Sequence, residues 1–138
     1  MNQSTRLLMI YEYLAGLSDT STGLLLIFAP AWTLHLMRVT SLPHPIVFAG
    51  FIGTFVLSVG LTYLLLAIGW PFSRRNADLW KSQWAFTAVV RTLVALYLLF
   101  QITRGHMEMA WLTVALSDGA LAGIQWVGLA RGWLTHAE

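Results

Sequence analysis

Five polar side chains lie inside otherwise apolar segments, and they are the residues of this chain that could do chemistry: Glu12, Asp19, Arg91, Asp118 and Gln125. Glu12 and Asp19 are seven residues apart, and so are Asp118 and Gln125. Seven residues make nearly two helical turns, so each pair shares one face of a helix. Carboxylates and an arginine at bilayer depth are typical of proton relays and of buried ion pairs. The spacing therefore predicts one inward-facing polar cluster.

The composition indicates where such a cluster would have to sit. Of the 138 residues, 57% are hydrophobic and only 10% are charged, whereas about a quarter of the residues of a soluble domain are charged. The basic residues are scattered between apolar stretches, which disfavours nucleic acid as a partner. The chain has no cysteine, which excludes disulfides and thiolate metal sites. These features predict an integral membrane protein.

Four apolar segments are long enough to cross a bilayer, which takes about 20 residues. They cover residues 6–29, 45–69, 79–103 and 108–131. Helices are expected because a backbone in lipid must satisfy its own hydrogen bonds. We therefore predict an all-α fold in which residues 1–138 form a single domain, an antiparallel bundle of four transmembrane helices.

Positive charges near the span ends predict the orientation, because cytoplasmic loops carry an excess of lysine and arginine. Five basic residues fall on the side of the N-terminus (Arg6, Arg74, Arg75, Lys81 and Arg131) and two on the other (Arg38 and Arg104). This count predicts that both termini lie inside, and we expect the location to be a bacterial cytoplasmic membrane. Tryptophans close to the predicted span ends are expected at the lipid–water interface: Trp32, Trp70, Trp80, Trp84, Trp111 and Trp133.

Glycines predict where helices approach closely, because helices in lipid associate through small residues. Gly50, Gly53 and Gly60 lie in the second segment, and Gly119 and Gly123 form a small-xxx-small pair in the fourth. Packing inside the bundle is the simpler interpretation of these residues. A self-association face is the alternative.

Arg91 is expected to pair with Asp118. Only a tight turn, Arg104-Gly105-His106, separates the third and fourth segments, so these two helices should be antiparallel neighbours. A charge at the bilayer centre costs about 2.5 to 3.5 kcal/mol on insertion scales, which favours pairing. Three carboxylates and one guanidinium would leave a net charge of minus two. At least one acid is therefore expected to be protonated, or to meet water, a cation or a partner.

That cluster leaves three interpretations open. It could be a purely structural network, a ligand or proton pathway, or a contact with another subunit. His35, His44 and His106 fall on the predicted outer side near Glu108, but their spacing matches no compact metal-ligand motif, and we expect no metal site. Nothing in the chain resembles a nucleophile elbow, a P-loop or a zinc-protease helix, so no catalytic residue is assigned.

The order of these features resembles that of small four-helix membrane proteins of the DoxX-like group. The resemblance is carried by TGLLLIFAP in the first segment, FAGFIGTFVLSVGLTYL in the second, VVRTLVALYL in the third and SDG in the fourth. Some members of that group are linked to respiratory or quinone-related oxidation systems. The resemblance implies an accessory membrane protein rather than a stand-alone enzyme, with quinone or lipid as a ligand. It assigns no catalytic residue.

Two functions therefore stand as expectations. The first is an accessory subunit or scaffold of a larger membrane complex, in contact with the lipid bilayer and with a membrane-protein partner or further copies of itself. The alternative is an oligomeric proton-coupled transporter of small solutes, in which Glu12, Asp19 and Asp118 titrate and Arg91 is the counter-charge. A membrane-embedded enzyme is a third class, but the sequence offers it no evident nucleophile or metal cage.

Overall fold

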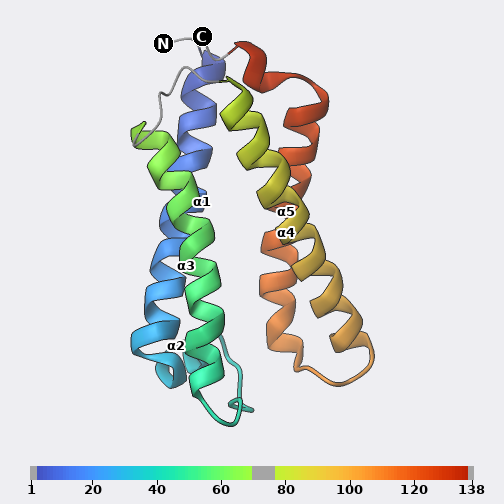
Figure 1. Cartoon of the computed structure of the whole chain (residues 1–138). Helices are drawn as coiled ribbons and strands as arrows, with labels where there is room; N and C mark the ends of the chain where they lie inside the picture. The colour runs from blue at the N-terminus through green and yellow to red at the C-terminus, as the bar shows by residue number, and fades with distance from the viewer. Residues whose placement is uncertain (1–2, 70–76, 137–138) are drawn as a thin grey trace.

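The computed structural model describes residues 3–69 and 77–136, and this part of the chain is helical with no strand (Figure 1). Four long helices form the body of the molecule: α1 (Gln3–Phe28), α3 (Val47–Ile68), α4 (Ala77–Thr103) and α5 (Leu112–Ala130). Three short helices accompany them: α2 (Pro30–Leu36), the 3₁₀ helix η1 (Met109–Trp111) and the 3₁₀ helix η2 (Trp133–His136). The predicted all-α fold is confirmed, and a long helix covers most of each predicted segment.

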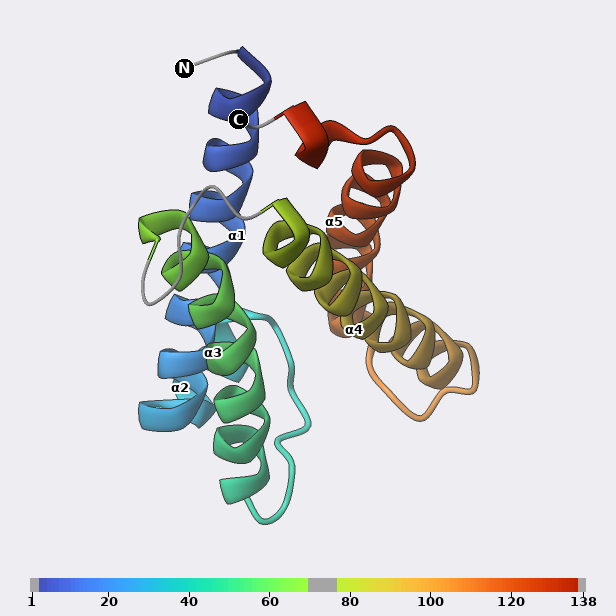
Figure 2. The same ribbon diagram turned by 45° about the horizontal axis from the view of Figure 1, so that its top comes forward.

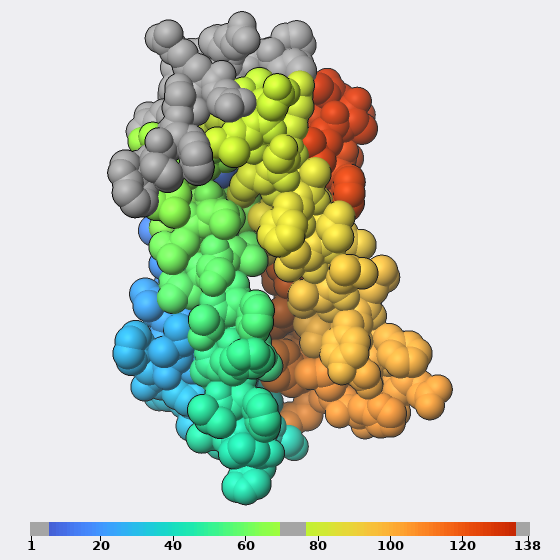
Figure 3. All heavy atoms as spheres, in the orientation of Figure 1, coloured from blue at the N-terminus to red at the C-terminus, as the bar shows by residue number. Residues whose placement is uncertain are grey.

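The long helices form two antiparallel hairpins. The most extensive contacts join α1 to α3 and α4 to α5, whereas α3 touches α4 only slightly. Figures 1 and 2 both show the two pairs side by side. We call the end where α1 begins and η2 lies the terminal end. The opposite end, with α2 and residues 37–46 and 104–108, is the loop end. In the space-filling view, a gap separates the surfaces of α3 and α4 about midway along the molecule (Figure 3).

Glycines bring the backbones of α1 and α3 close together. A Cβ atom on Gly60 would lie 2.4 Å from the backbone nitrogen of Thr20, and one on Gly53 would lie 2.8 Å from the carbonyl oxygen of Gly23. A Cβ on Gly50 would make only ordinary contact, 3.6 Å from the nearest atom of α1. The second segment therefore uses Gly53 and Gly60 for close packing, and Gly50 less so.

Two of the three glycines of α5, Gly119 and Gly123, behave differently. A Cβ on Gly119 would meet only the Cβ of Ala95, at 3.9 Å, and one on Gly123 would meet nothing within 4 Å among the described residues. Both glycines are exposed. The structure gives no support to the simpler interpretation, close packing inside the bundle, for this pair, because Gly119 only borders Ala95 of α4 and Gly123 meets no neighbour among the described residues.

The connection between α4 and α5 is short, but it is longer than the predicted turn of three residues, because residues 104–108 and the 3₁₀ helix η1 separate the two helices. Helix α4 ends at Thr103, and Gly105 follows with a φ of 72°, a left-handed conformation that glycine adopts without strain. The chain then reverses, so that α5 packs against α4 in the opposite direction. This reversal places Arg91 and Asp118 on neighbouring helices.

Two apolar clusters lie at opposite ends of the bundle. Near the terminal end, five residues from the helices and η2 form one cluster: Leu8, Leu66, Trp80, Trp84 and Leu134. Near the loop end, four residues form the other: Leu26, Leu34, Val39 and Ala49. The tryptophan expectation is therefore wrong for two residues, because Trp80 and Trp84 are 4% and 1% exposed and belong to the core. Trp70 lies outside the described residues.

Three helical segments are long and apolar enough to cross a membrane: Val47–Ile68, Ala77–Thr103 and Met109–Ala130. Large apolar side chains such as Phe51, Phe86 and Leu93 are more than half exposed on them, which supports an integral membrane protein. Helix α1 has the length to cross but is more polar, because it contains Glu12, Asp19 and a run of serines and threonines.

Candidate functional site

All four long helices meet at Arg91, which is 4% exposed. Its Nη1 donates a hydrogen bond to Asp118 of α5 and its Nη2 donates one to Asp19 of α1. Its Nε donates to the hydroxyl oxygen of Tyr63 of α3 at 3.2 Å. The predicted ion pair between Arg91 and Asp118 is present, and Asp19 forms a second ion pair with Arg91. Arg91 therefore joins one hairpin to the other.

The fork of the guanidinium makes this arrangement possible. An arginine carries five N–H donors in one plane, so it can address several acceptors at once. The side chains of Asp19 and Asp118 are 15% and 18% exposed, which leaves each carboxylate partly accessible from outside the contact. We call Arg91, Asp19, Asp118 and Tyr63 the central layer.

A second polar layer lies toward the terminal end. Gln125 Nε2 donates to the Tyr63 hydroxyl oxygen at 2.9 Å and contacts Thr87 Oγ1 at 2.6 Å. Trp84 Nε1 donates to Glu12 Oε1 at 2.5 Å. Glu12, Thr87 and Gln125 are each 0% exposed. The Tyr63 hydroxyl thus accepts from both Arg91 and Gln125 and connects the two layers.

The two layers have a simple origin in the sequence. Glu12 and Asp19 on α1, Trp84 and Arg91 on α4, and Asp118 and Gln125 on α5 are each seven residues apart, which places both members of a pair on one helix face. Helices α1 and α4 run from the terminal end, and α5 runs toward it. Asp19, Arg91 and Asp118 consequently meet in the central layer. Glu12, Trp84 and Gln125 lie in the second layer, closer to the terminal end.

Some buried polar atoms have no hydrogen-bonding partner within the part of the chain that the structure describes. They include Glu12 Oε2 and Gln125 Oε1 in the second layer and Thr20 Oγ1 beside it in α1. A buried ionised carboxylate without a cation is costly. Glu12 accepts one hydrogen bond, from the Trp84 N–H. Of the carboxylates in the network, it is therefore the one whose negative charge would be stabilised least.

Sequence reasoning found Glu12, Asp19, Arg91, Asp118 and Gln125, and the structure brings all five into one network. It missed the residues that link them: Tyr63, Thr87 and Trp84. Trp84 carried a usable signal, because it precedes Arg91 by the same seven residues that separate the other pairs. Tyr63 carried none, because its position against Arg91 depends on how α3 packs across the hairpins.

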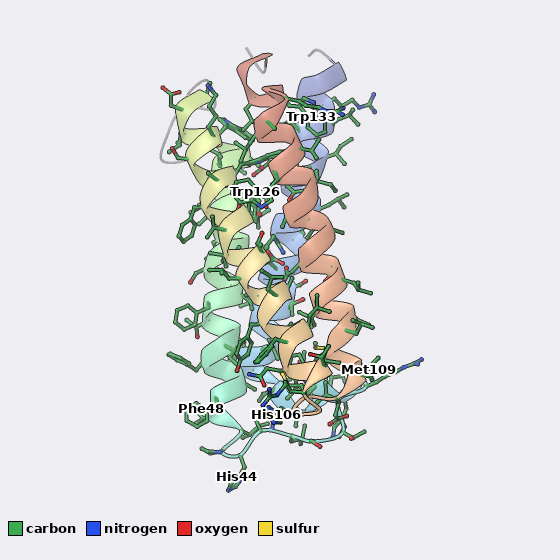
Figure 4. The ribbon with its side chains drawn as sticks, turned by 90° about the vertical axis from the view of Figure 1, so that its right-hand side faces the viewer. His44, Phe48, His106, Met109, Trp126 and Trp133 are labelled. Atoms are coloured by element: carbon green, nitrogen blue, oxygen red, sulfur yellow. The ribbon has the colours of Figure 1, made fainter. Side chains whose placement is uncertain are left out.

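A separate contact joins the hairpins at the loop end. The Glu108 carboxylate accepts hydrogen bonds from the Thr40 N–H at 3.0 Å, from the Thr40 hydroxyl at 2.9 Å and from the Ser41 N–H. These donors lower the pKa of Glu108 to about 2. Figure 4 places His44 and His106 at this same end. No group of three or more histidines and acids in the described chain could hold a metal ion.

Comparison of the chain with models of protein families, with curated proteins and with solved structures finds no match.

Proposed function

We propose that this protein is a four-span membrane protein with both termini inside, and that it serves as an accessory or scaffold subunit of a larger membrane complex. In this proposal α1 is the fourth span, and its charged residues are tolerated because Arg91 pairs with Asp19. The DoxX-like resemblance, a respiratory or quinone-linked setting and a bacterial cytoplasmic membrane belong to the same proposal.

The observation that carries the proposal is the uncovered glycine pair on α5. Gly119 and Gly123 lie on one face, and a Cβ on either would have room. Leu116 and Val127 border them and are 60% and 43% exposed. In lipid, such a small-residue face permits the close backbone approach that drives helix association. By contrast Gly53, Gly60 and Gly128 are filled by neighbours, so the α5 face is the one left for a partner helix.

The hydrogen bonds of the central layer also support a structural role for the protein. Every nitrogen of the Arg91 guanidinium donates to a residue of this chain. An arginine so engaged holds the hairpins together and leaves the outer helix faces for partners.

The test is to add bulk to the glycine face. Leucine at both Gly119 and Gly123 should leave the folded chain intact, since a Cβ at Gly119 makes only ordinary contact with Ala95 and one at Gly123 meets open space, but it should release the protein from its complex. Native mass spectrometry of gently extracted native membranes would compare this variant with Thr54→Leu, which adds bulk to an exposed position of α3. Retention of the double leucine variant in the complex, or a wild-type chain found alone, would contradict the proposal.

Proton-coupled transport of a small solute remains the second candidate, and one observation favours it. Glu12 is fully buried with one unpartnered oxygen, and it lies in the layer next to the partly exposed Asp19 and Asp118. A carboxyl that can exchange a proton beside a fixed cation is what a proton relay requires. In liposomes with a pH-sensitive dye inside, proton uptake under a membrane potential should occur with the wild type and be lost in Glu12→Gln. Absence of uptake with the wild type would remove this candidate.

A further inference from the structure

A cavity of about 440 Å³ opens at the loop end, between the two hairpins. Its walls come from both halves of the molecule: Leu26 of α1, Ala49 and Ile52 of α3, and Trp111 of η1. Its volume falls within the range of ligand sites, about 300 to 1,000 Å³. The Glu108 contact with Thr40 and Ser41 fixes its rim.

The walls select an apolar molecule, and the rim selects against an anion. Apart from Ser41, His106 and Glu108, the cavity is lined by apolar side chains and by Gly105. The described lining contains no lysine or arginine. Glu108 is ionised at neutral pH, and its hydrogen bonds lower its pKa further. A carboxylate or phosphate head group would therefore meet a negative charge, and the described lining offers it no cation. Both oxygens of the Glu108 carboxylate already accept hydrogen bonds from Thr40 and Ser41, so the carboxylate offers a cationic head group little, and a neutral head group fits the rim.

His106 adds a preference for a hydrogen-bond donor. Its Nδ1 lies 3.0 Å from the amide oxygen of Gln101. An amide oxygen only accepts, so in the neutral imidazole this contact assigns the hydrogen to Nδ1 and leaves Nε2 as an acceptor. Within the described chain Nε2 has no hydrogen-bonding partner, and His106 lines the cavity.

We propose that this cavity binds a neutral hydroxyl-headed amphiphile from the membrane, a long-chain alcohol or a phenol, with its apolar body between the hairpins and its hydroxyl donating to His106. The proposal is independent of the accessory-subunit role, because the cavity and the α5 glycine face lie on different surfaces.

The test uses a photoreactive probe and its matched derivatives. Hexadecanol with a mid-chain diazirine, its methyl ether and the corresponding carboxylic acid would each be added to the protein in phosphatidylcholine nanodiscs. Mass spectrometry would then map the labelled peptides. The alcohol should label residues 41–52 and 105–111, and untagged hexadecanol should compete. With the ether or the acid, the yield of labelled peptide should be at least about fivefold lower, since one net hydrogen bond is worth about that factor in affinity.

Two variants separate a site from general contact with lipid. Ile52→Trp adds bulk to the cavity wall and should abolish the labelling, whereas Phe55→Trp should leave it unchanged, since Phe55 is similarly exposed on the same helix but does not line the cavity. His106→Phe should make alcohol and ether label equally. Equal labelling by alcohol and ether on the wild type, or labelling that survives Ile52→Trp, would overturn the proposal. The comparison of alcohol with ether uses the wild-type protein, so it does not depend on whether a variant folds.

Discussion

Arg91 links helix α4 to the other three long helices, because its three guanidinium nitrogens donate to Tyr63 of α3, Asp118 of α5 and Asp19 of α1. Removing one partner of a buried ion pair costs more than the pair itself contributes, since the remaining charge is left without compensation. Here two aspartates would be left facing each other across the bundle. The arginine is therefore a fixed cation on which both carboxylates depend.

We expect Arg91→Leu to destabilise the protein by about 3 kcal/mol, the lower end of the range for breaking a buried pair, because both aspartates retain some exposure. Combining it with Asp19→Asn and Asp118→Asn should restore about half of that loss, since no uncompensated charge remains. Unfolding in detergent, followed by circular dichroism, measures both. A triple variant no more stable than Arg91→Leu alone would show that charge compensation is not the role of the arginine.

Glu108 provides a pH-dependent contact at the loop end. Its pKa in the folded chain is about 2, below the ordinary value of 4.5. The contact is therefore fully present above pH 4.5 and is lost as the pH falls toward 2. It releases Thr40 and Ser41 when the carboxylate is protonated.

Hydrogen exchange of the Thr40 and Ser41 amides should report this contact. At pH 6, Glu108→Gln should exchange about tenfold faster than the wild type at these amides, because a charge-assisted acceptor is replaced by a neutral one. The ratio should fall as the pH passes through about 2, the pKa of the folded carboxyl, and approach one below it. Asp78→Asn, a change at a 94% exposed side chain at the other end of the molecule, should leave it at one throughout. A ratio for Glu108→Gln that stays constant between pH 6 and pH 2 would contradict this assignment.

At the scale of elements, the glycines divide into those that set the spacing of helices and those that do not. Gly60 allows the backbones of α1 and α3 to approach at Asp19 and Thr20, beside the aspartate that pairs with Arg91. Gly123 sits on a helix of the same kind, yet it touches no neighbouring element within the described structure. The packing partner, and not the residue type, decides the role.

The pair provides a matched test. Gly60→Ala should destabilise the protein by about 1 to 3 kcal/mol, because the added methyl group would lie 2.4 Å from the backbone of Thr20 and force the helices apart. Gly123→Ala should be neutral or slightly stabilising, since alanine favours a helix and the space is open. Thermal unfolding in the same detergent compares them. Equal effects of the two substitutions would refute the close approach of α1 and α3.

At the scale of the whole molecule, the contacts between the hairpins in the described structure gather at three levels. They are the apolar cluster at the terminal end, the two polar layers, and the Glu108 contact with its neighbouring apolar packing at the loop end. Between the levels α3 and α4 separate, as Figure 3 shows. This division creates the cavity at the loop end, because two rigid hairpins diverge there and residues 37–46 and 104–108 form its rim.

The proposed orientation can be read by labelling from outside the cell. The chain has no cysteine, so a single cysteine introduces a unique thiol. With both termini inside, an impermeant maleimide should label His44→Cys on intact cells and should label Asp78→Cys only after lysis. Both positions are exposed, so accessibility alone cannot separate them. The reverse pattern would invert the topology, and labelling of both on intact cells would exclude α3 as a span.

The sequence by itself determined the helical class, the approximate ends of the long helices and the identity of the buried charged residues. Lipid-compatible helices need long apolar runs, and a seven-residue spacing fixes which side chains share a face; both properties are local to one segment. The pairing of Arg91 with Asp118 followed from a short turn, which is also local.

Tertiary structure decided the rest, because it depends on how segments far apart in the chain meet. It brought Asp19 to Arg91, inserted Tyr63 between the two polar layers and buried Trp84 against Glu12 where the sequence suggested an interfacial position. It also left Gly119 and Gly123 uncovered while filling Gly53 and Gly60. Helix rotation and separation fix these outcomes, and they result from the packing of all helices together, which no single segment encodes.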